Sequence, residues 1–226
     1  MTRLEALHSE MIECRACPRL VAWREEVART KVKRFRAWDY WARPLPGFGD
    51  PEARLLIMGL APAAHGGNRT GRMFTGDNSG NFLYAALHRA GLANQPTSER
   101  RGDGLELRGA YITAPCRCAP PANKPLPEEL LRCSAWLDRE VALLPSLRVV
   151  LALGSIGWGA ALAHLSRRGF EVPRPRPLFG HGAEARFPQG PALLGSYHVS
   201  QQNTNTGKLT PQMIDRVLAR AKELMR

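Results

Sequence analysis

The run from Gly59 to Gly80 concentrates side chains and glycines that could do chemistry. It reads GLAPAAHGGNRTGRMFTGDNSG and follows the apolar run RLLIM, which predicts a buried strand. Open α/β sheets bind ligands where a strand ends, and glycines there let a phosphate or a planar base approach the backbone closely. The run also supplies polar and stacking groups, namely Asn68, Arg69, Arg72, Phe74 and Asp77. The sequence therefore predicts a ligand-binding loop at this strand end.

Four of the five cysteines form a potential metal-ligand set. Cys14 and Cys17 make an N-terminal C-x-x-C pair, and Cys118 and Cys133 have fourteen residues between them. An odd number of cysteines argues against a disulfide framework. Four thiolates suit an iron–sulfur cluster or a structural zinc, and spacing alone does not separate iron from zinc. Cys116 is then the spare thiol; the alternative is that all five are isolated buried thiols.

Two further polar loops follow later strand candidates. Asn123 lies in CRCAPPANKPLP, and His198 begins HVSQQNTNTG. Parallel strands bring their carboxyl ends to one edge of a sheet, so these loops can form one pocket with Phe74 and Asp77. The residue types suit a flipped nucleobase: a ring to stack on, an amide for the base edge, and a histidine to stabilise charge on a leaving base. The carboxylate could position water or stabilise a cationic sugar.

Each of these side chains also has a purely structural interpretation. Asp77 can cap the helix that follows it, and Asn123 can make a turn. A lone phenylalanine beside a glycine loop can simply pack locally. His198 can be a hydrogen-bonded structural histidine, in which case His65 or His181 is the functional one. The placement of all four at strand ends favours the functional interpretation.

The elements that must position these loops alternate between strand and helix. Apolar runs predict strands at residues 54–58, 109–113, 148–153 and 192–199. Helical spacing and capping residues predict helices at 81–91, 127–144, 157–165 and from Thr210-Pro211 onward, with interrupted helical stretches over 4–30. This alternation predicts an α/β fold with a mainly parallel sheet. We expect one domain over 1–226, in which residues 1–50 or so contribute the first cysteine pair.

The charge of the chain favours a polyanionic partner. The formal net charge is +12 and the isoelectric point is near 10.3, which suits nucleic acid. The densest basic run is RTKVKRFR at residues 29–36, which is either a solvated helix face or a phosphate-contacting surface. The sequence has no apolar run of transmembrane length, and its N-terminus lacks the apolar stretch of a signal peptide. We therefore expect a cytoplasmic protein that associates with the nucleoid through DNA.

The motifs together resemble the uracil-DNA glycosylase superfamily, and most of all its family 5, the type B enzymes. GLAPAAHGGNRTGRMFTGD resembles the first motif of that family and HVSQQNTNTG the second, and the resemblance covers Cys14 to Gly207. Tyr111 through Asn123 is similar to the strand, cysteine, two prolines and asparagine of related iron–sulfur glycosylases. The resemblance implies a three-layer α/β sandwich with a central four-stranded parallel sheet flanked by helices.

The resemblance also implies a cofactor and a set of site residues. It assigns Cys14, Cys17, Cys118 and Cys133 to a [4Fe-4S] cluster and leaves Cys116 free. Asp77 and His198 are the expected catalytic residues. The expected substrate-binding residues are Gly59, Ala61, Ala63, Phe74 and Asn123, and the expected DNA contacts are Arg69, Arg72, Gln201, Gln202 and Asn203. The cluster should be structural, because hydrolysis of a base needs no redox step.

One departure from the superfamily pattern concerns the hydrolytic water. Other families place an aspartate or glutamate just after the first strand, where this chain has Leu60, Ala61 and Ala63. Asp77 is the substitute candidate. An N-glycosidic bond can break through an oxocarbenium-like sugar and a stabilised base anion, so weak activation of water can suffice. A motif without a side chain crowding the base also implies a broader range of deaminated bases.

The function expected from these observations is a monomeric DNA-repair glycosylase. It would hydrolyse the N-glycosidic bond of uracil, and of other deaminated bases, in double-stranded DNA and leave an abasic site. The alternative is a non-catalytic iron–sulfur or zinc protein that binds DNA or recognises damage. Base release separates the two.

Overall fold

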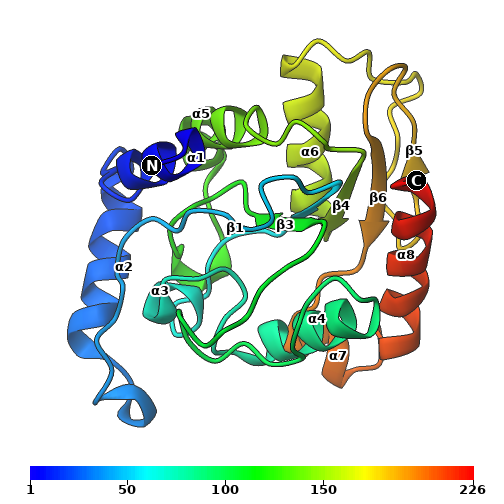
Figure 1. Ribbon diagram of the computed structural model, residues 1–226. Helices are drawn as coiled ribbons and strands as arrows, with labels where there is room; N and C mark the ends of the chain where they lie inside the picture. The colour runs from blue at the N-terminus through cyan, green and yellow to red at the C-terminus, as the bar shows by residue number, and fades with distance from the viewer.

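The computed structural model describes residues 1–226 and contains one mixed sheet between two helical layers (Figure 1). The sheet has the order β1-β3-β2-β4-β6-β5, and its four central strands are parallel. The strands are β1 (Phe48–Gly49), β2 (Leu55–Met58), β3 (Ala110–Thr113), β4 (Val149–Leu153), β5 (Glu184–Ala185) and β6 (Ala192–Ser196). The parallel sheet and the three layers expected from the sequence are confirmed.

The helices cover the two faces of the sheet. They are α1 (Arg3–Met11), α2 (Pro18–Thr30), α3 (Gly67–Thr70), α4 (Asn78–Arg89), α5 (Pro127–Val141), α6 (Ser155–Arg167), α7 (Gln201–Asn205) and α8 (Pro211–Leu224), with two 3₁₀ turns, η1 (Lys33–Phe35) and η2 (Pro121–Asn123). None of these helices has the length and apolar character needed to cross a membrane.

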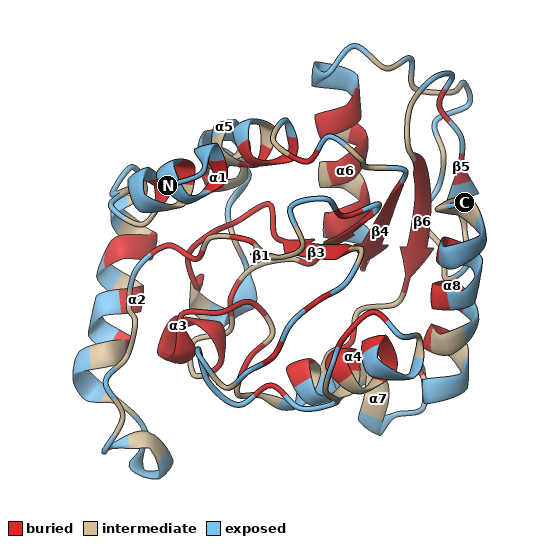
Figure 2. Ribbon diagram, viewed as in Figure 1, coloured by how far each residue is buried: buried red, intermediate tan, exposed pale blue.

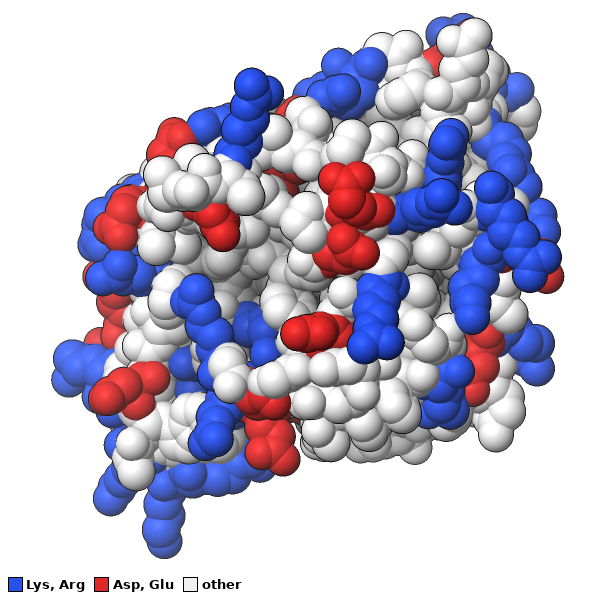
Figure 3. Space-filling view, viewed as in Figure 1, with Lys and Arg blue, Asp and Glu red and all other residues white.

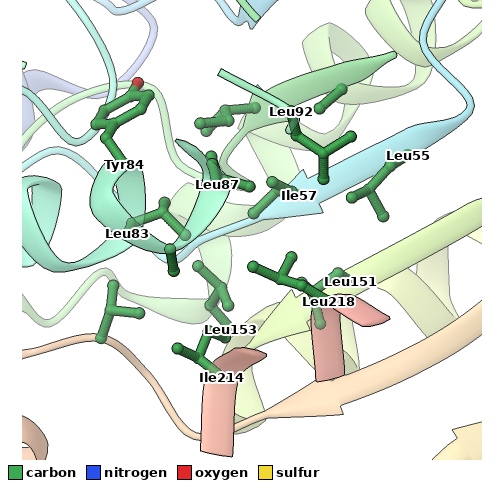
Figure 4. Close-up of a cluster of buried hydrophobic side chains, with 14 of the residues drawn as sticks. Leu55, Ile57, Leu83, Tyr84, Leu87, Leu92, Leu151, Leu153, Ile214 and Leu218 are labelled. Carbon is green, nitrogen blue, oxygen red and sulfur yellow. The ribbon is translucent and has the colours of Figure 1, made fainter. Parts of the chain in front are cut away.

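The central strands are buried at every position and mostly apolar, because both faces of the sheet are covered (Figure 2). Successive strand residues point to opposite faces, so Leu55 and Ile57 pack with α4 and α8, whereas Leu56 and Met58 pack with α5 and α6. Figure 4 shows the first of these layers, with Leu83 and Leu87 of α4 facing the strands. The sheet is therefore a rigid platform for the loops at its edge.

The sheet is wider than the four strands expected. Two two-residue strands, β1 and β5, pair antiparallel with the outer strands β3 and β6. Strands this short carry too little apolar pattern to be recognised in a sequence. Helices α3 and α7 were also not expected, because each lies inside a polar loop of the predicted site. The basic run at residues 29–36 is not a helix face beyond Thr30, where α2 ends.

Candidate active site

The predicted loops meet at the carboxyl edge of the parallel strands, where the order of strands reverses between β2 and β4. Gly59 follows β2, and a Cβ atom there would lie 2.8 Å from Cζ of Phe74. Glycine is thus required for the Phe74 ring to lie against the end of β2. Phe74 itself has a positive φ of 50°, so the surrounding loop holds it in a backbone conformation that non-glycine residues seldom adopt.

The structure places His198 next to Phe74. Their ring centroids are 6.1 Å apart with an interplanar angle of 37°. Gly154, at the end of β4, lies against His198, since a Cβ atom at this glycine would lie 3.3 Å from Cβ of His198. Burial lowers the pKa of His198, so the imidazole is neutral at neutral pH. A neutral imidazole can donate one hydrogen bond to an anion without carrying a charge of its own.

Asp77 caps α4 and also faces a cavity. Its Oδ1 accepts a hydrogen bond of 2.9 Å from the Gly80 amide, as the capping interpretation predicted. Its second oxygen lies so close to Gly66 that a side chain at that position would overlap it. Burial raises the pKa of Asp77, against the hydrogen bonds from the Gly80 and Ser79 amides. One carboxylate oxygen of Asp77 therefore caps the helix, and the other has no capping role and lies in a partly desolvated environment.

A cavity of about 390 Å³ brings Asp77 and Asn123 together. Ala63 and His65 line it as well. Asn123 is exposed and has a φ of 56°, which is compatible with the turn predicted for it. Asp77 is the one acidic residue that lines this cavity.

His65, which was weighed as an alternative functional histidine, is held by a neighbour. Its Nδ1 lies 3.0 Å from the hydroxyl of Tyr40. Burial and the charge of Arg69 lower its pKa.

Ala61 lies apart from the cavity. It packs against Leu20, Cys116 and Cys118, on the side of the cysteines. Of the two alanines that replace an acid after β2, only Ala63 lines the cavity.

Arg69 and Arg72, which were predicted to contact DNA, are both buried in the structure. The guanidinium of Arg69 lies over the rings of both Phe35 and Trp38, 3.8 and 4.1 Å from their centroids. Arg72 makes a two-point ion pair with Asp103 at 2.7 and 2.8 Å. Both arginines thus hold the glycine-rich loop in place.

Of the residues predicted to contact DNA after β6, Asn203 has an internal role. Its Nδ2 donates to the carbonyl of His198 at 2.8 Å, and its own carbonyl accepts from the Leu209 amide. Gln201 and Gln202 are exposed on α7 and stay predicted DNA contacts.

The four predicted ligand cysteines surround one cavity. Cys14 and Cys17 come from the N-terminal segment, Cys118 from the loop after β3 and Cys133 from α5. Cys116 lies outside this cavity, and its thiol donates to the carbonyl of Cys118 at 3.3 Å. Neither these four nor any other His, Cys, Asp or Glu residues form a group of three or more that could hold a single metal ion.

Two of these thiols accept hydrogen bonds, one from a buried arginine and one from a backbone amide. Arg24 is almost fully buried, donates to Sγ of Cys118 at 2.9 Å and makes no ion pair with a carboxylate. Its Nε is buried without a hydrogen-bond partner. The backbone amide of Arg117 points at Sγ of Cys133, 3.3 Å away. The local sequence around Arg24 does not predict that this arginine contacts a cysteine.

A buried carboxylate behind the site was not foreseen. Glu140 is fully buried and is surrounded by hydrogen-bonding groups: the Gly47 amide at 2.8 Å, Thr113 Oγ1 at 2.6 Å, Arg117 Nη2 at 2.7 Å, and Tyr111 OH and His8 Nε2 at 3.2 Å each. Burial alone would raise the pKa of Glu140, but the charge of Arg117 and these hydrogen bonds hold it at about 2. The network joins α1, β3, α5 and the loop that carries Cys118.

Comparison with known proteins assigns the family. A model of the uracil DNA glycosylase superfamily matches residues 46–222. A Type-5 uracil-DNA glycosylase of Thermus thermophilus is 57% identical over 220 residues, 97% of each chain. Those of Mycobacterium bovis and Mycobacterium leprae are 55% and 52% identical, over 93% and 96% of this chain and 78% and 94% of theirs. The chain therefore belongs to the uracil-DNA glycosylase superfamily and, within it, to the type-5 uracil-DNA glycosylases.

Proposed function

We propose that this chain hydrolyses the N-glycosidic bond of uracil in DNA and leaves an abasic site for base excision repair. The observation that carries the proposal is that two pairs, Phe74 with His198 and Asp77 with Asn123, lie in the loops at the switch point of the sheet in a chain of this family. A base inside a duplex is out of reach of such a pocket. The nucleotide must therefore be flipped out, at a cost in unstacking that damaged or mispaired bases reduce.

In this mechanism each residue acts on a different part of the extruded nucleotide. The ring of Phe74 stacks on the base, and Asn123 reads its edge with one donor and one acceptor. Neutral His198 donates a hydrogen bond to the leaving base as it becomes an anion, in a site where burial strengthens that interaction. No proton transfer from His198 is needed.

Asp77 is the proposed partner of the cationic sugar and of the attacking water. It is the one carboxylate in the cavity, and the segment after β2 offers only Leu60, Ala61 and Ala63 in place of the acid of other families. A carboxylate stabilises an oxocarbenium-like sugar by charge and can accept a proton from water. Ala63 leaves room beside the base, which supports activity on deaminated purines as well as uracil.

Base release from uracil-containing duplexes tests the proposal directly. Wild-type protein should generate alkali-sensitive abasic sites in a U:G duplex, and a His198→Leu variant should do so about 10²-fold more slowly, the usual cost of losing one oxyanion donor. Tight binding of this DNA with no base release after prolonged incubation contradicts the proposal and favours a non-catalytic DNA-binding protein. Sedimentation of the protein on a short duplex checks the monomeric state proposed for it.

We further propose that Cys14, Cys17, Cys118 and Cys133 hold a [4Fe-4S] cluster. In such a cluster each cysteine ligates a different iron, so the four cysteine sulfurs need only surround a cavity. A single zinc ion would instead require the four sulfurs to converge on one point. Buried Arg24, which has no carboxylate partner, suits the negative charge of a cluster with four thiolates. The cluster would supply a structural link between the N-terminal segment and the loop that carries Asn123.

Paired cysteine variants test this ligand set. Cys118→Ser should lose the brown colour and most of the iron, because it removes a ligand. Cys116→Ser, two residues away and also buried, should retain about four irons per chain. Iron analysis and visible absorption after anaerobic purification provide the measurement. Stoichiometric zinc in a colourless wild-type protein, or equal loss of iron in both variants, overturns the assignment.

A further inference from the structure

The chain between α2 and the glycine-rich loop forms a projecting basic turn. Residues 31–36, which we call the basic hook, contain Lys31, Lys33, Arg34 and Arg36. Lys31 has a φ of 47°, which turns the chain away from α2, and η1 then completes the hook. Figure 1 shows the hook at the far end of α2, and Figure 3 shows Lys and Arg side chains gathered there, at the lower left.

The hook is fixed to the active-site loop. The guanidinium of Arg69 contacts the rings of Phe35, in the hook, and Trp38, just after it, at 3.8 and 4.1 Å from the two ring centroids. The backbone continues this attachment, because the amides of Trp41 and Ala42 donate to the carbonyls of Arg69 and Asn68 at 3.0 Å. Ordering the hook on binding therefore costs little conformational entropy.

The cations of the hook have no anionic partner in the protein. None of the four makes an ion pair, and the sequence has no acidic residue between Glu26 and Asp39. Arg29, one turn earlier, is by contrast paired with Glu26. Unpaired cations held close together favour a ligand that brings several negative charges in a row.

The hook also forms part of the wall of the proposed active site. Val32, Arg34 and Phe35 line the same cavity as Asp77 and Asn123. The guanidinium of Arg34 lies over the Phe35 ring, 4.4 Å from its centroid. A nucleotide whose base and sugar enter the cavity carries its own flanking phosphates past this point.

We propose that the basic hook binds the phosphates that flank the flipped nucleotide on the damaged strand, through Lys33, Arg34 and Arg36. The proposal rests on the proposed function and adds a DNA-binding site to it. The hook lies within residues 29–36, for which the sequence left a phosphate-contacting surface open, and buried Arg69 holds the hook in position.

A triple variant, Lys33→Gln, Arg34→Gln and Arg36→Gln, tests the proposal on a duplex that carries a tetrahydrofuran abasic analogue. Each lost phosphate contact reduces the slope of log K against log salt by about 0.9, so the slope should become shallower by about 2 to 3 and the affinity should fall at least about tenfold at 0.15 M salt. The control replaces Arg108, Arg148 and Arg168 by glutamine. These are equally exposed, unpaired cations at the opposite edge of the sheet, before β3, before β4 and at the end of α6.

Neutral methylphosphonate linkages locate the contact. Placed on either side of the tetrahydrofuran site, they should weaken binding of the wild type but have little further effect on the hook variant. Equal losses in the hook and control variants, or undiminished sensitivity of the hook variant to methylphosphonate, overturn the proposal. Because this duplex is not cleaved, the result is independent of base release, and a failure of the proposed function is recognised separately.

Discussion

A Glu140→Gln variant is expected to unfold about 10 °C below the wild type. Four of the five groups around the carboxylate of Glu140 donate hydrogen bonds to it, and His8 does so when its Nε2 carries the proton. The amide nitrogen of glutamine is itself a donor, so it would face these donors at a position that needs an acceptor. The substitution also leaves Arg117, which is 1% exposed, without its counter-ion. Breaking one side of a buried ion pair costs about 3–5 kcal/mol, and 1 kcal/mol lowers the melting temperature of a chain this size by about 2–4 °C.

The pH dependence of stability should change in the same variant. The pKa of Glu140 is depressed to about 2 in the folded protein. Its contribution to folding stability is therefore fully present above the unfolded-state pKa of about 4.3 and is lost as the pH falls towards 2. The Glu140→Gln variant should show a flatter fall in stability over this range, measured by thermal unfolding from pH 5 to 2.5. Glu10→Gln is the control, because it breaks an exposed pair with Arg139, the residue directly before Glu140 in α5. Equal melting temperatures for the two variants contradict the prediction.

The sequence was most informative for features that are determined by residues close together in the chain. Apolar runs located the four central strands to within a few residues, because strands covered on both faces are buried at every position and mostly apolar. Phe74 and His198 could be paired in advance, since parallel strands bring their following loops to one edge. The edge strands β1 and β5, with two residues each, carry no such pattern.

The charged residues were the hardest to interpret. Arg69 and Arg72 stand in a glycine-rich loop, which favours ligand contact, but aromatic rings 34 and 31 residues earlier and an acid at position 103 remove them from the surface. Glu140 looks like one more helical surface residue, and its partners come from three separate parts of the chain: α1, the segment before β1, and β3 with the loop after it. Contacts of this range depend on the packing of the whole molecule, which local composition does not encode.

Replacing Asp77 by asparagine should separate catalysis from stability. Asparagine caps helices as well as aspartate does, so the bond to the Gly80 amide and the start of α4 should survive. The substitution removes a carboxylate whose pKa is raised by burial. Such a group favours folding in its protonated form, and this contribution is lost as pH rises through its folded pKa. The variant should therefore be at least as stable as the wild type at pH 7.

Its turnover should nevertheless fall about 10² to 10⁴-fold, because the cavity has no other acid to stabilise the cationic sugar or accept a proton from water. The wild-type single-turnover rate should decline as acid protonates Asp77, at a pH above the usual carboxyl range near 3.9, and the variant should lack this decline. Asp77→Ser, which also retains a cap, should behave alike. A stable Asn variant with wild-type rates on uracil and hypoxanthine duplexes would leave Asp77 as the cap of α4 alone, and the water would then need no carboxylate at this site.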